Sequence, residues 1–205
     1  MYKIRPGLVI GFHGCDEKVQ KEVINGKKTL ESSKNDYDWL GHGTYFWEYS
    51  VDRALCFANE LKNFPQRNKS TITNPAVIGA VINLGKCLDL LDYKNLELLK
   101  VSYKVLAEEA KNENKELPRN KSINGSNDLL IRHLDCAVIQ NLHTILKENN
   151  FPPFDSVRGV FLEGDDLYLN AGFKEKNHIQ LCIINPNCIK GYFLPRTNDD
   201  KFEEV

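Results

Sequence analysis

One apolar run near the middle of the chain limits the fold more than any other feature. Residues 76–84, with the sequence AVIGAVINL, contain no charged side chain and are rich in valine and isoleucine. Such a run is typical of a strand in the centre of a sheet, buried on both faces. It is far shorter than the roughly 20 residues that a membrane-spanning helix needs. We therefore expect a sheet built around residues 76–84.

The remaining patterns place strands at both ends of the chain and helices in the middle. A short helix is expected after the N-cap Asp16, and a longer one after the N-cap Ser50. Leucines at helical spacing predict two amphipathic helices within about residues 92–150. This order predicts an α+β fold, with a single domain over residues 1–205 and a helical insertion at about 92–150. The expected strands are residues 8–14, 43–47, 76–84, 157–162, 178–184 and 188–194.

Composition and charge indicate a folded protein and exclude several classes. The 205 residues carry 27 basic and 28 acidic side chains and are 41% hydrophobic, which excludes disorder and argues against a general polyanion binder. No segment resembles a signal peptide or a membrane span. The six cysteines and five histidines form no C-x-x-C or H-E-x-x-H motif. We expect reduced cysteines packed as small core residues, no metal site and a cytoplasmic location.

Two short glycine-containing motifs are the places where chemistry is expected. His13-Gly14 ends the first predicted strand, where an imidazole can enter a cleft and a bare backbone can approach a planar ligand. Residues 41–45 (GHGTY) end in Tyr45, a flat ring with a polar tip. Each motif alone also fits a structural role, as a histidine satisfied within the fold or as a core aromatic side chain.

Together the two motifs resemble the ADP-ribosyltransferase superfamily, and in particular its diphtheria-toxin and poly(ADP-ribose) polymerase branch, which has a His-Tyr-Glu triad. Three later segments are similar to segments of that branch: residues 79–85 (GAVINLG), 154–157 (FDSV) and 180–189 (QLCIINPNCI). The resemblance spans about residues 8–194. It implies a split β-sandwich, in which two small sheets lie around an NAD cleft.

The resemblance also assigns residues that bind the cofactor, with NAD as the substrate. It implies that His13 holds a ribose hydroxyl and that the Gly14 backbone pairs with the nicotinamide carboxamide. Thr44 and Tyr45 would lie at the nicotinamide ring, with Tyr45 stacked on it. The chain requires no metal under this interpretation.

Two further parts of the cofactor's surroundings stay open at this point. The branch has a second stacking tyrosine eleven positions after the first, which here falls at Cys56. Phe57 is the replacement that we expect, with Tyr49 and Trp47 as alternatives. The loop at residues 32–40 is either a lid over NAD or an ordinary surface connection.

The catalytic glutamate of the branch falls at Gln180, if the Asn-Pro pair at residues 185–186 anchors the alignment. Glutamine can bond the ribose 2′-hydroxyl, but it carries no charge with which to stabilise a cation. His178 lies two residues earlier on the same side of the strand and is a candidate base. Glu163 ends an apolar run and is the carboxylate that we expect as a substitute; Glu48 ranks lower.

The resulting prediction is a mono-ADP-ribosyltransferase that moves ADP-ribose from NAD to a macromolecular acceptor and releases nicotinamide. The sequence does not distinguish a protein acceptor from a nucleic acid. A toxin or defence effector, with an antitoxin or inhibitor protein as partner and no membrane, is the setting that such a small transferase suggests. Two alternatives stay open: an NAD glycohydrolase, and a pseudoenzyme that binds NAD as a recognition module.

Overall fold

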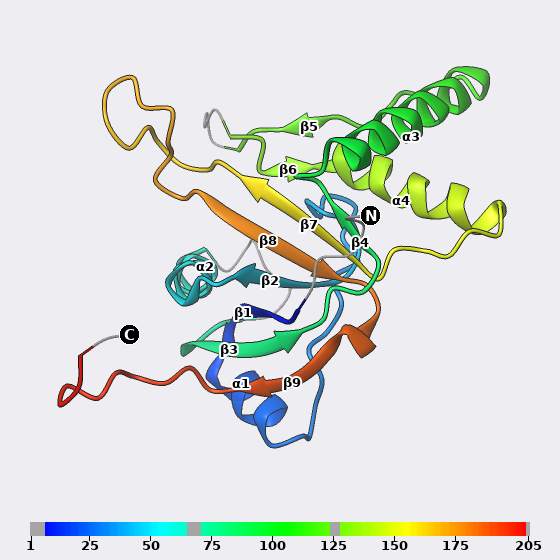
Figure 1. Ribbon diagram of the computed structural model, residues 1–205. Coiled ribbons are helices and arrows are strands. Elements are labelled where there is room, and N and C mark those ends of the chain that lie inside the picture. The colour runs from blue at the N-terminus through cyan, green and yellow to red at the C-terminus, as the bar shows by residue number, and fades with distance from the viewer. Residues whose placement is uncertain (1–6, 65–70, 124–127, 204–205) are drawn as a thin grey trace.

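A mixed sheet of seven strands forms the framework of the molecule (Figure 1). The computed structural model describes residues 7–64, 71–123 and 128–203. Within these residues the strands lie in the order β4-β7-β8-β2-β1-β3-β9, beside a separate ribbon of β5 and β6. The described residues also form four α-helices, so the predicted α+β class is confirmed.

Three strands make up one side of the sheet. β1 (Val9–Asp16) pairs antiparallel along its whole length with β3 (Pro75–Ile82). β9 (Ile189–Phe193) pairs with the other edge of β3 and follows a 3-10 turn, η2 (Pro186–Cys188). The apolar run is therefore a strand with neighbours on both edges, as predicted.

Four strands make up the other side. β2 (Thr44–Glu48) pairs antiparallel with β8 (His178–Ile183), and β8 pairs with β7 (Ser156–Phe161). The edge strand β4 (Cys87–Asp89) runs parallel to β7. Arg158 on β7 links three of these strands, because its guanidinium contacts Glu48 on β2 at 2.5 Å and Asp89 on β4 at 3.2 Å. Glu48 thus braces the sheet, in keeping with its low rank as a catalytic candidate.

The two sides meet at β1 and β2, which share only two register pairs: Gly11 with Glu48 and Phe12 with Trp47. The resemblance implied two separate small sheets. The structure corrects this expectation, because hydrogen bonding joins all seven strands and the division remains only as this short junction. The rest of β1 and β2 carries no register pairs between the two strands.

Side-chain caps begin the first two helices where the sequence predicts them. Asp16 accepts a hydrogen bond from the Lys18 N–H at the start of α1 (Glu17–Ile24). Ser50 accepts one from the Arg53 N–H at the start of α2 (Val51–Asn63). Each cap satisfies a backbone donor that the helix itself leaves unpaired.

Both helices predicted within about residues 92–150 are present. Figure 1 shows α3 (Tyr93–Asn112) and α4 (His133–Glu148) packed together near β4 and β7, away from α1. Between them, β5 (Asn120–Lys121) and β6 (Ile131–Arg132) form the small ribbon. Residues 124–127, between these two strands, lie outside the described residues.

Strand alternation gives the sheet two differently covered faces. Phe46 and Leu181 are fully buried in a cluster that includes Val23 of α1. Tyr45 and Trp47 lie on the opposite face, where Tyr45 packs in the cluster with Ile139 of α4 and Trp47 in the cluster with Ala54 of α2.

All six cysteines are free, and four of them are buried, as expected for small core residues. Cys56 is exposed on α2, so the expectation of core packing is wrong at that position. No helix in the described ranges is long and apolar enough to cross a membrane.

Candidate functional site

The unpaired stretch of β1 and β2 contains the predicted histidine. Continuing the register of the junction would pair Gly14 with Tyr45, so that the Gly14 N–H would donate to the Tyr45 carbonyl. Instead, Nδ1 of His13 lies 2.7 Å from that carbonyl oxygen. A carbonyl only accepts, so Nδ1 carries the proton and Nε2 remains a hydrogen-bond acceptor. The imidazole thus replaces the next backbone bond between the two strands.

The Gly14 backbone faces the same unpaired stretch. The Ile10 carbonyl accepts from the Tyr49 N–H at 3.0 Å, so the peptide groups of alternate residues after Ile10 also point toward β2. Gly14 is one of these residues, and β2 gives it no register partner. A side chain is excluded here, because a Cβ atom on Gly14 would lie 2.1 Å from the Ala54 carbonyl oxygen of α2. The close approach of α2 requires glycine at this position.

Tyr45 is held by its hydroxyl group. The hydroxyl donates to the Gly41 carbonyl at 2.6 Å and accepts from the Leu40 N–H at 2.9 Å. Burial raises the pKa of this phenol well above its ordinary value. Thr44, next to it, is buried and pairs with Ile183. These bonds fix the Tyr45 ring against the turn at residues 40–41; stacking on a nicotinamide ring stays a prediction.

Five side chains on the α2-covered face form what we call the polar cluster: Trp47, Arg53, Glu163, His178 and Gln180. The Arg53 guanidinium lies 5.6 Å from the Trp47 ring centroid, and its Nη2 atom lies 2.7 Å from Oε2 of Glu163. The His178 ring lies 6.5 Å from the Trp47 ring, and Gln180 stands opposite Trp47 in the β2–β8 register. All three polar residues that the sequence marked as catalytic are therefore in this cluster.

Several buried polar atoms of the cluster have no hydrogen-bond partner among the described residues: Nε1 of Trp47, Nε of Arg53, Nε2 of His178 and Oε1 of Gln180. A buried polar group without a partner costs about 1–3 kcal/mol. Folded proteins keep few such groups, and a set of them in one place asks for an explanation beyond packing. An ordered water or a bound ligand at this position would satisfy these atoms.

His178 is poised as a neutral imidazole. Its Nδ1 atom lies 2.7 Å from the Lys176 carbonyl, so Nδ1 holds the proton and Nε2 has a free lone pair. Burial lowers the pKa of His178, and the positive charges of Arg53 and Arg132 lower it further. A neutral ring with a free lone pair can accept a proton at neutral pH.

Glu163 is not a free carboxylate. Its side chain is 11% exposed and forms the ion pair with Arg53, whose side chain is 10% exposed. The Lys176 ammonium lies 3.9 Å from the other carboxylate oxygen. Two cations thus hold the one carboxylate of the polar cluster, which weakens its candidacy as a replacement for the missing catalytic glutamate.

The structure also describes Phe57 and the loop at residues 32–40, whose roles toward NAD stay predictions. Phe57 packs on Trp47, with ring centroids 4.8 Å apart, and thus borders the polar cluster. Leu40 is completely buried, and Nε1 of Trp39 donates to the Leu130 carbonyl at 2.8 Å. The end of the loop is therefore anchored in the core, and only its earlier residues resemble a surface connection.

Arg53 is the site residue that the sequence interpretation missed. It shares one side of α2 with Phe57 and Glu60, at helical spacing. Glu60 lies 4.0 Å from Arg53 and 2.8 Å from Lys176. A charged residue on the stripe that also carries Phe57 was the signal that could have revealed it.

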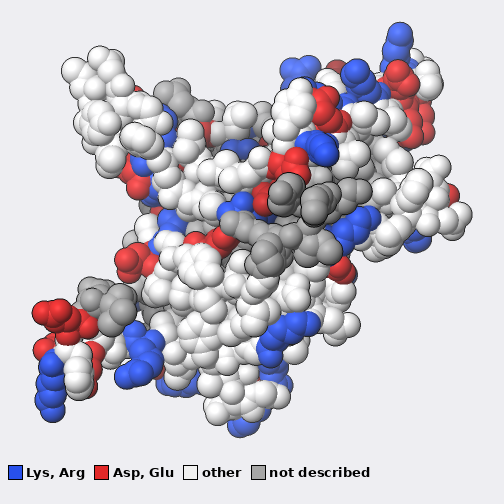
Figure 2. Space-filling model, viewed as in Figure 1, with Lys and Arg blue, Asp and Glu red and all other residues white. Residues whose placement is uncertain are grey.

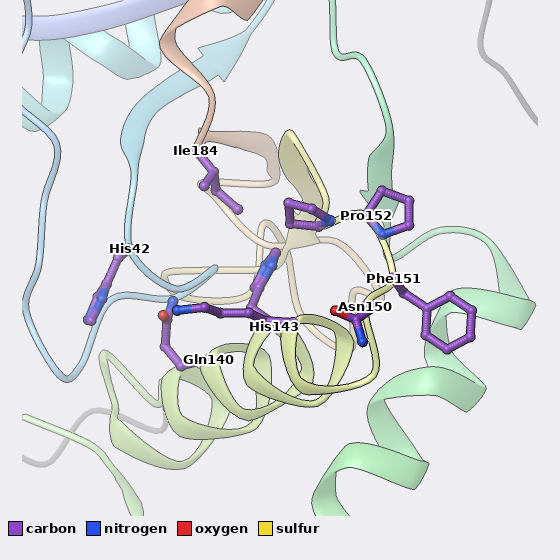
Figure 3. Close-up of a pocket in the computed structure, with 9 residues that line it drawn as sticks. His42, Gln140, His143, Asn150, Phe151, Pro152 and Ile184 are labelled. Carbon is purple, nitrogen blue, oxygen red and sulfur yellow. The ribbon is translucent and has the colours of Figure 1, made fainter.

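A separate pocket of about 610 Å³ lies at the other end of β2 and β8 (Figure 3). None of the predicted site residues lines it. Its lining includes His42, Gln140, His143, Lys147, Pro152 and Ile184. In the described parts of the chain, no group of three or more His, Cys, Asp or Glu side chains is arranged to hold a metal ion.

Comparisons with known proteins give one similarity. The chain is similar to the uncharacterized protein MJ0359 of Methanocaldococcus jannaschii, with 28% identity over 210 residues, covering 92% of this chain and 89% of that protein. No family model matches the chain, and no solved structure matches it. The similarity runs through nearly the whole of both proteins, and the name of the archaeal protein states no activity.

Proposed function

We propose that the chain is an NAD-dependent mono-ADP-ribosyltransferase, in which the nicotinamide end of NAD lies at the unpaired stretch of β1 and β2. The observation that carries this proposal is the interruption at Gly14. Its peptide groups point toward β2, while the carbonyl that should accept from it is bound by His13. The N–H and C=O of one residue that has no register partner on β2 complement the carbonyl and amino group of a carboxamide.

His13 and Gln180 come from opposite faces of the sheet, because His13 packs on Phe46 whereas Gln180 stands opposite Trp47. In this proposal Nε2 of His13 accepts a hydrogen bond from a ribose hydroxyl at the unpaired stretch, and the Gln180 amide contacts the ribose from the α2-covered face. Breaking the bond between ribose and nicotinamide creates positive charge on the ribose and leaves neutral nicotinamide. The acceptor group attacks that carbon, and His178 takes the proton that the acceptor loses.

The acceptor in this proposal is macromolecular. The loop between β7 and β8 leads directly into His178 and exposes apolar side chains, with Leu169 at 90% and Tyr168 at 59% exposure. Figure 2 shows this loop at the upper left as mainly uncharged atoms, while charges of both signs are mixed elsewhere on the visible face. Exposed apolar surface is typical of contacts with other macromolecules.

A second function is favoured by one specific observation. Gln180 has no charge, and Arg53 holds Glu163. The polar cluster therefore lacks a free carboxylate to stabilise the cationic ribose. In this alternative function, the chain would bind NAD as a recognition module without turning it over.

One assay separates these functions. The full chain is incubated with NAD labelled in the adenosine part, with and without pools of protein, RNA and DNA, and nicotinamide release and label transfer are measured. Release that requires an acceptor supports the transferase. Release without an acceptor identifies a glycohydrolase, and saturable NAD binding without release identifies the module. Absence of NAD binding by the folded chain overturns the proposal. Lys104→Met, which changes an exposed residue of α3, is the control variant and should behave like the parent chain.

A further inference from the structure

The pocket at the far end of β2 and β8 has one wall made by α4. Gln140, His143 and Lys147 follow one another at intervals of three and four residues, so they share one side of the helix. Figure 3 shows Ile184 across from this wall, with Pro152 at one side and His42 at the other. The volume of about 610 Å³ falls within the range of small-molecule sites.

The two glycines of Gly41-His42-Gly43 explain how His42 comes to line this pocket. Gly41 has φ +78°, and a Cβ there would lie 2.6 Å from Nε2 of Gln140. A Cβ on Gly43 would lie 2.4 Å from the Cys182 sulfur. Both glycines are thus needed for the backbone to press against α4 and β8. His42 between them is the side chain that lines the pocket.

The polar walls are positive or neutral. Lys147, His42, His143 and Gln140 all offer hydrogen-bond donors, and no Asp or Glu is among the lining residues. Just outside, the Lys86 ammonium bonds the Pro152 carbonyl and lies 4.7 Å from the Phe154 ring centroid. The pocket therefore favours a negatively charged group.

His143 lines the pocket with a half-buried imidazole. Its Nε2 atom is buried without a hydrogen-bond partner, and its ring meets the Phe154 ring edge-on at 6.0 Å. A bare lone pair is tolerated there more readily than an N–H without an acceptor, so the proton belongs on Nδ1. Burial, and then the Lys86 charge, lower the pKa of His143. The neutral ring is thus a donor for an anion's oxygen.

Ile184 and Pro152 give the pocket apolar surfaces beside these donors. We propose that the pocket binds a small organic phosphate that carries a flat ring, with its phosphate at Lys147, His143 and His42 and its ring against Ile184 and Pro152. A phosphate monoester offers three terminal acceptor oxygens and more negative charge than a carboxylate, which suits donors that come from both α4 and the residue 41–43 loop. This second site is independent of the NAD cleft.

The test uses phenyl phosphate as the probe, titrated into the full chain. Binding is measured by calorimetry, and the imidazole NMR signals of His42 and His143 are followed. We expect saturable binding that shifts both signals. Phenol lacks the charge and inorganic phosphate lacks the ring, so each should bind at least about tenfold more weakly than phenyl phosphate.

Matched variants locate the binding. Lys147→Met should weaken phenyl phosphate binding by about tenfold or more, because it removes the charged contact. Lys104→Met removes an exposed lysine from α3 and should leave binding unchanged, as should His13→Ala in the NAD cleft. Thermal unfolding of each variant verifies that the fold is retained.

Three results would overturn the proposal: no saturable binding of phenyl phosphate, equal binding of phenol, or equal affinity in Lys147→Met and the parent chain. A loss of binding in His13→Ala would also overturn it, because the probe would then occupy the NAD cleft. NAD turnover is not part of this experiment, so its outcome is separate from that of the proposed function.

Discussion

Nδ1 of His13 lies 2.7 Å from the carbonyl oxygen of Tyr45, the acceptor that the Gly14 N–H would use if β1 and β2 stayed in register. One side chain thus ends the pairing of two strands and fixes its own orientation. The same bond fixes the imidazole tautomer, which leaves Nε2 for a ligand. A structural role and a binding role therefore meet in His13, and the two can be separated experimentally.

Replacing His13 tests this dual role. His13→Ala removes the bond to Tyr45 and should lower the free energy of unfolding by about 1–2 kcal/mol, and it should abolish nicotinamide release. His13→Asn keeps an N–H near the Nδ1 position but has no acceptor where Nε2 was. It should recover most of the stability and none of the activity. Urea unfolding and a nicotinamide assay check both; equal stability of the two variants would contradict the structural role.

Gly14 makes a sharper packing prediction. In Gly14→Ala the new Cβ would meet the Ala54 carbonyl at 2.1 Å, so α2 must move. We expect a loss of about 2–3 kcal/mol of stability, as for an overpacked core. Gly191→Ala is the matched control, since a Cβ on Gly191 meets nothing within 4 Å. Thermal or urea unfolding measures the stability loss of each variant. Similar losses in Gly14→Ala and Gly191→Ala would contradict the close approach of α2 to Gly14.

The Arg53–Glu163 ion pair should couple strongly, because both side chains are largely buried. Arg53→Met leaves a buried carboxylate without its main partner and should cost about 3 kcal/mol. Adding Glu163→Gln should restore at least about 1 kcal/mol of that loss. The exposed pair Glu17–Lys21, also 2.7 Å apart, is the control and should couple by less than about 0.5 kcal/mol. Additive losses at Arg53 and Glu163 would contradict the buried pair.

Buried histidines predict how stability depends on pH. Burial lowers the pKa of His13, His143 and His178 in the folded chain. The unfolded chain takes up protons near pH ~6.5, where the folded chain does not. The unfolding free energy should therefore fall as the pH drops below about 6.5, by up to ~1.4 kcal/mol per pH unit for each group.

Urea unfolding between pH 7.5 and 5.5 measures this dependence, and His178→Gln should make it shallower. His133→Gln is the control, because His133 is not one of these three histidines and its side chain is 28% exposed. His133→Gln should leave the fall in unfolding free energy between pH 7.5 and 5.5 unchanged. A pH dependence unchanged by His178→Gln would show that His178 is protonated, or equally charged, in both states.

Local patterns predicted the elements of this fold well, since they depend on neighbours in sequence. The caps at Asp16 and Ser50 and the buried strand at 76–84 needed only spacing and side-chain chemistry. That His178 and Gln180 share one side followed from strand alternation alone. The joining of the two expected sheets depends on two register pairs, which no local pattern encodes.

Contacts between distant elements lay beyond the sequence. Arg53 and Glu163 are separated by 110 positions and meet because α2 packs on β1, β2 and β3, within reach of the loop that follows β7. The Tyr45 hydroxyl bonds to residues 40–41, because the preceding loop is anchored by Trp39 and Leu40. The sequence suggested that the Tyr45 ring stacks on a ligand. It could not show which groups bond the Tyr45 hydroxyl, because these partners depend on the fold.

Gln180→Glu is the sharpest test of the proposed chemistry. The change places a carboxylate among Trp47, Arg53 and His178, with almost no change in shape. If the amide substitutes for a carboxylate in the family's own reaction, the variant should keep or raise nicotinamide release, because the new charge stabilises the cationic ribose. If the site is tuned around a neutral group, the charge should raise the pKa of His178 and compete with Glu163 for Arg53, and transfer should slow.

Gln180→Ala completes this comparison. Loss of a preorganised polar group next to developing charge should reduce release by about a hundredfold. Rates of the parent chain and both variants are measured across pH 5.5–8.5, because a raised pKa of His178 would move the acidic limb of the profile toward higher pH. Release unchanged in both variants would make Gln180 a bystander. The unpaired Oε1 atom would then have no part in NAD chemistry, and the alignment through residues 185–186 would be wrong.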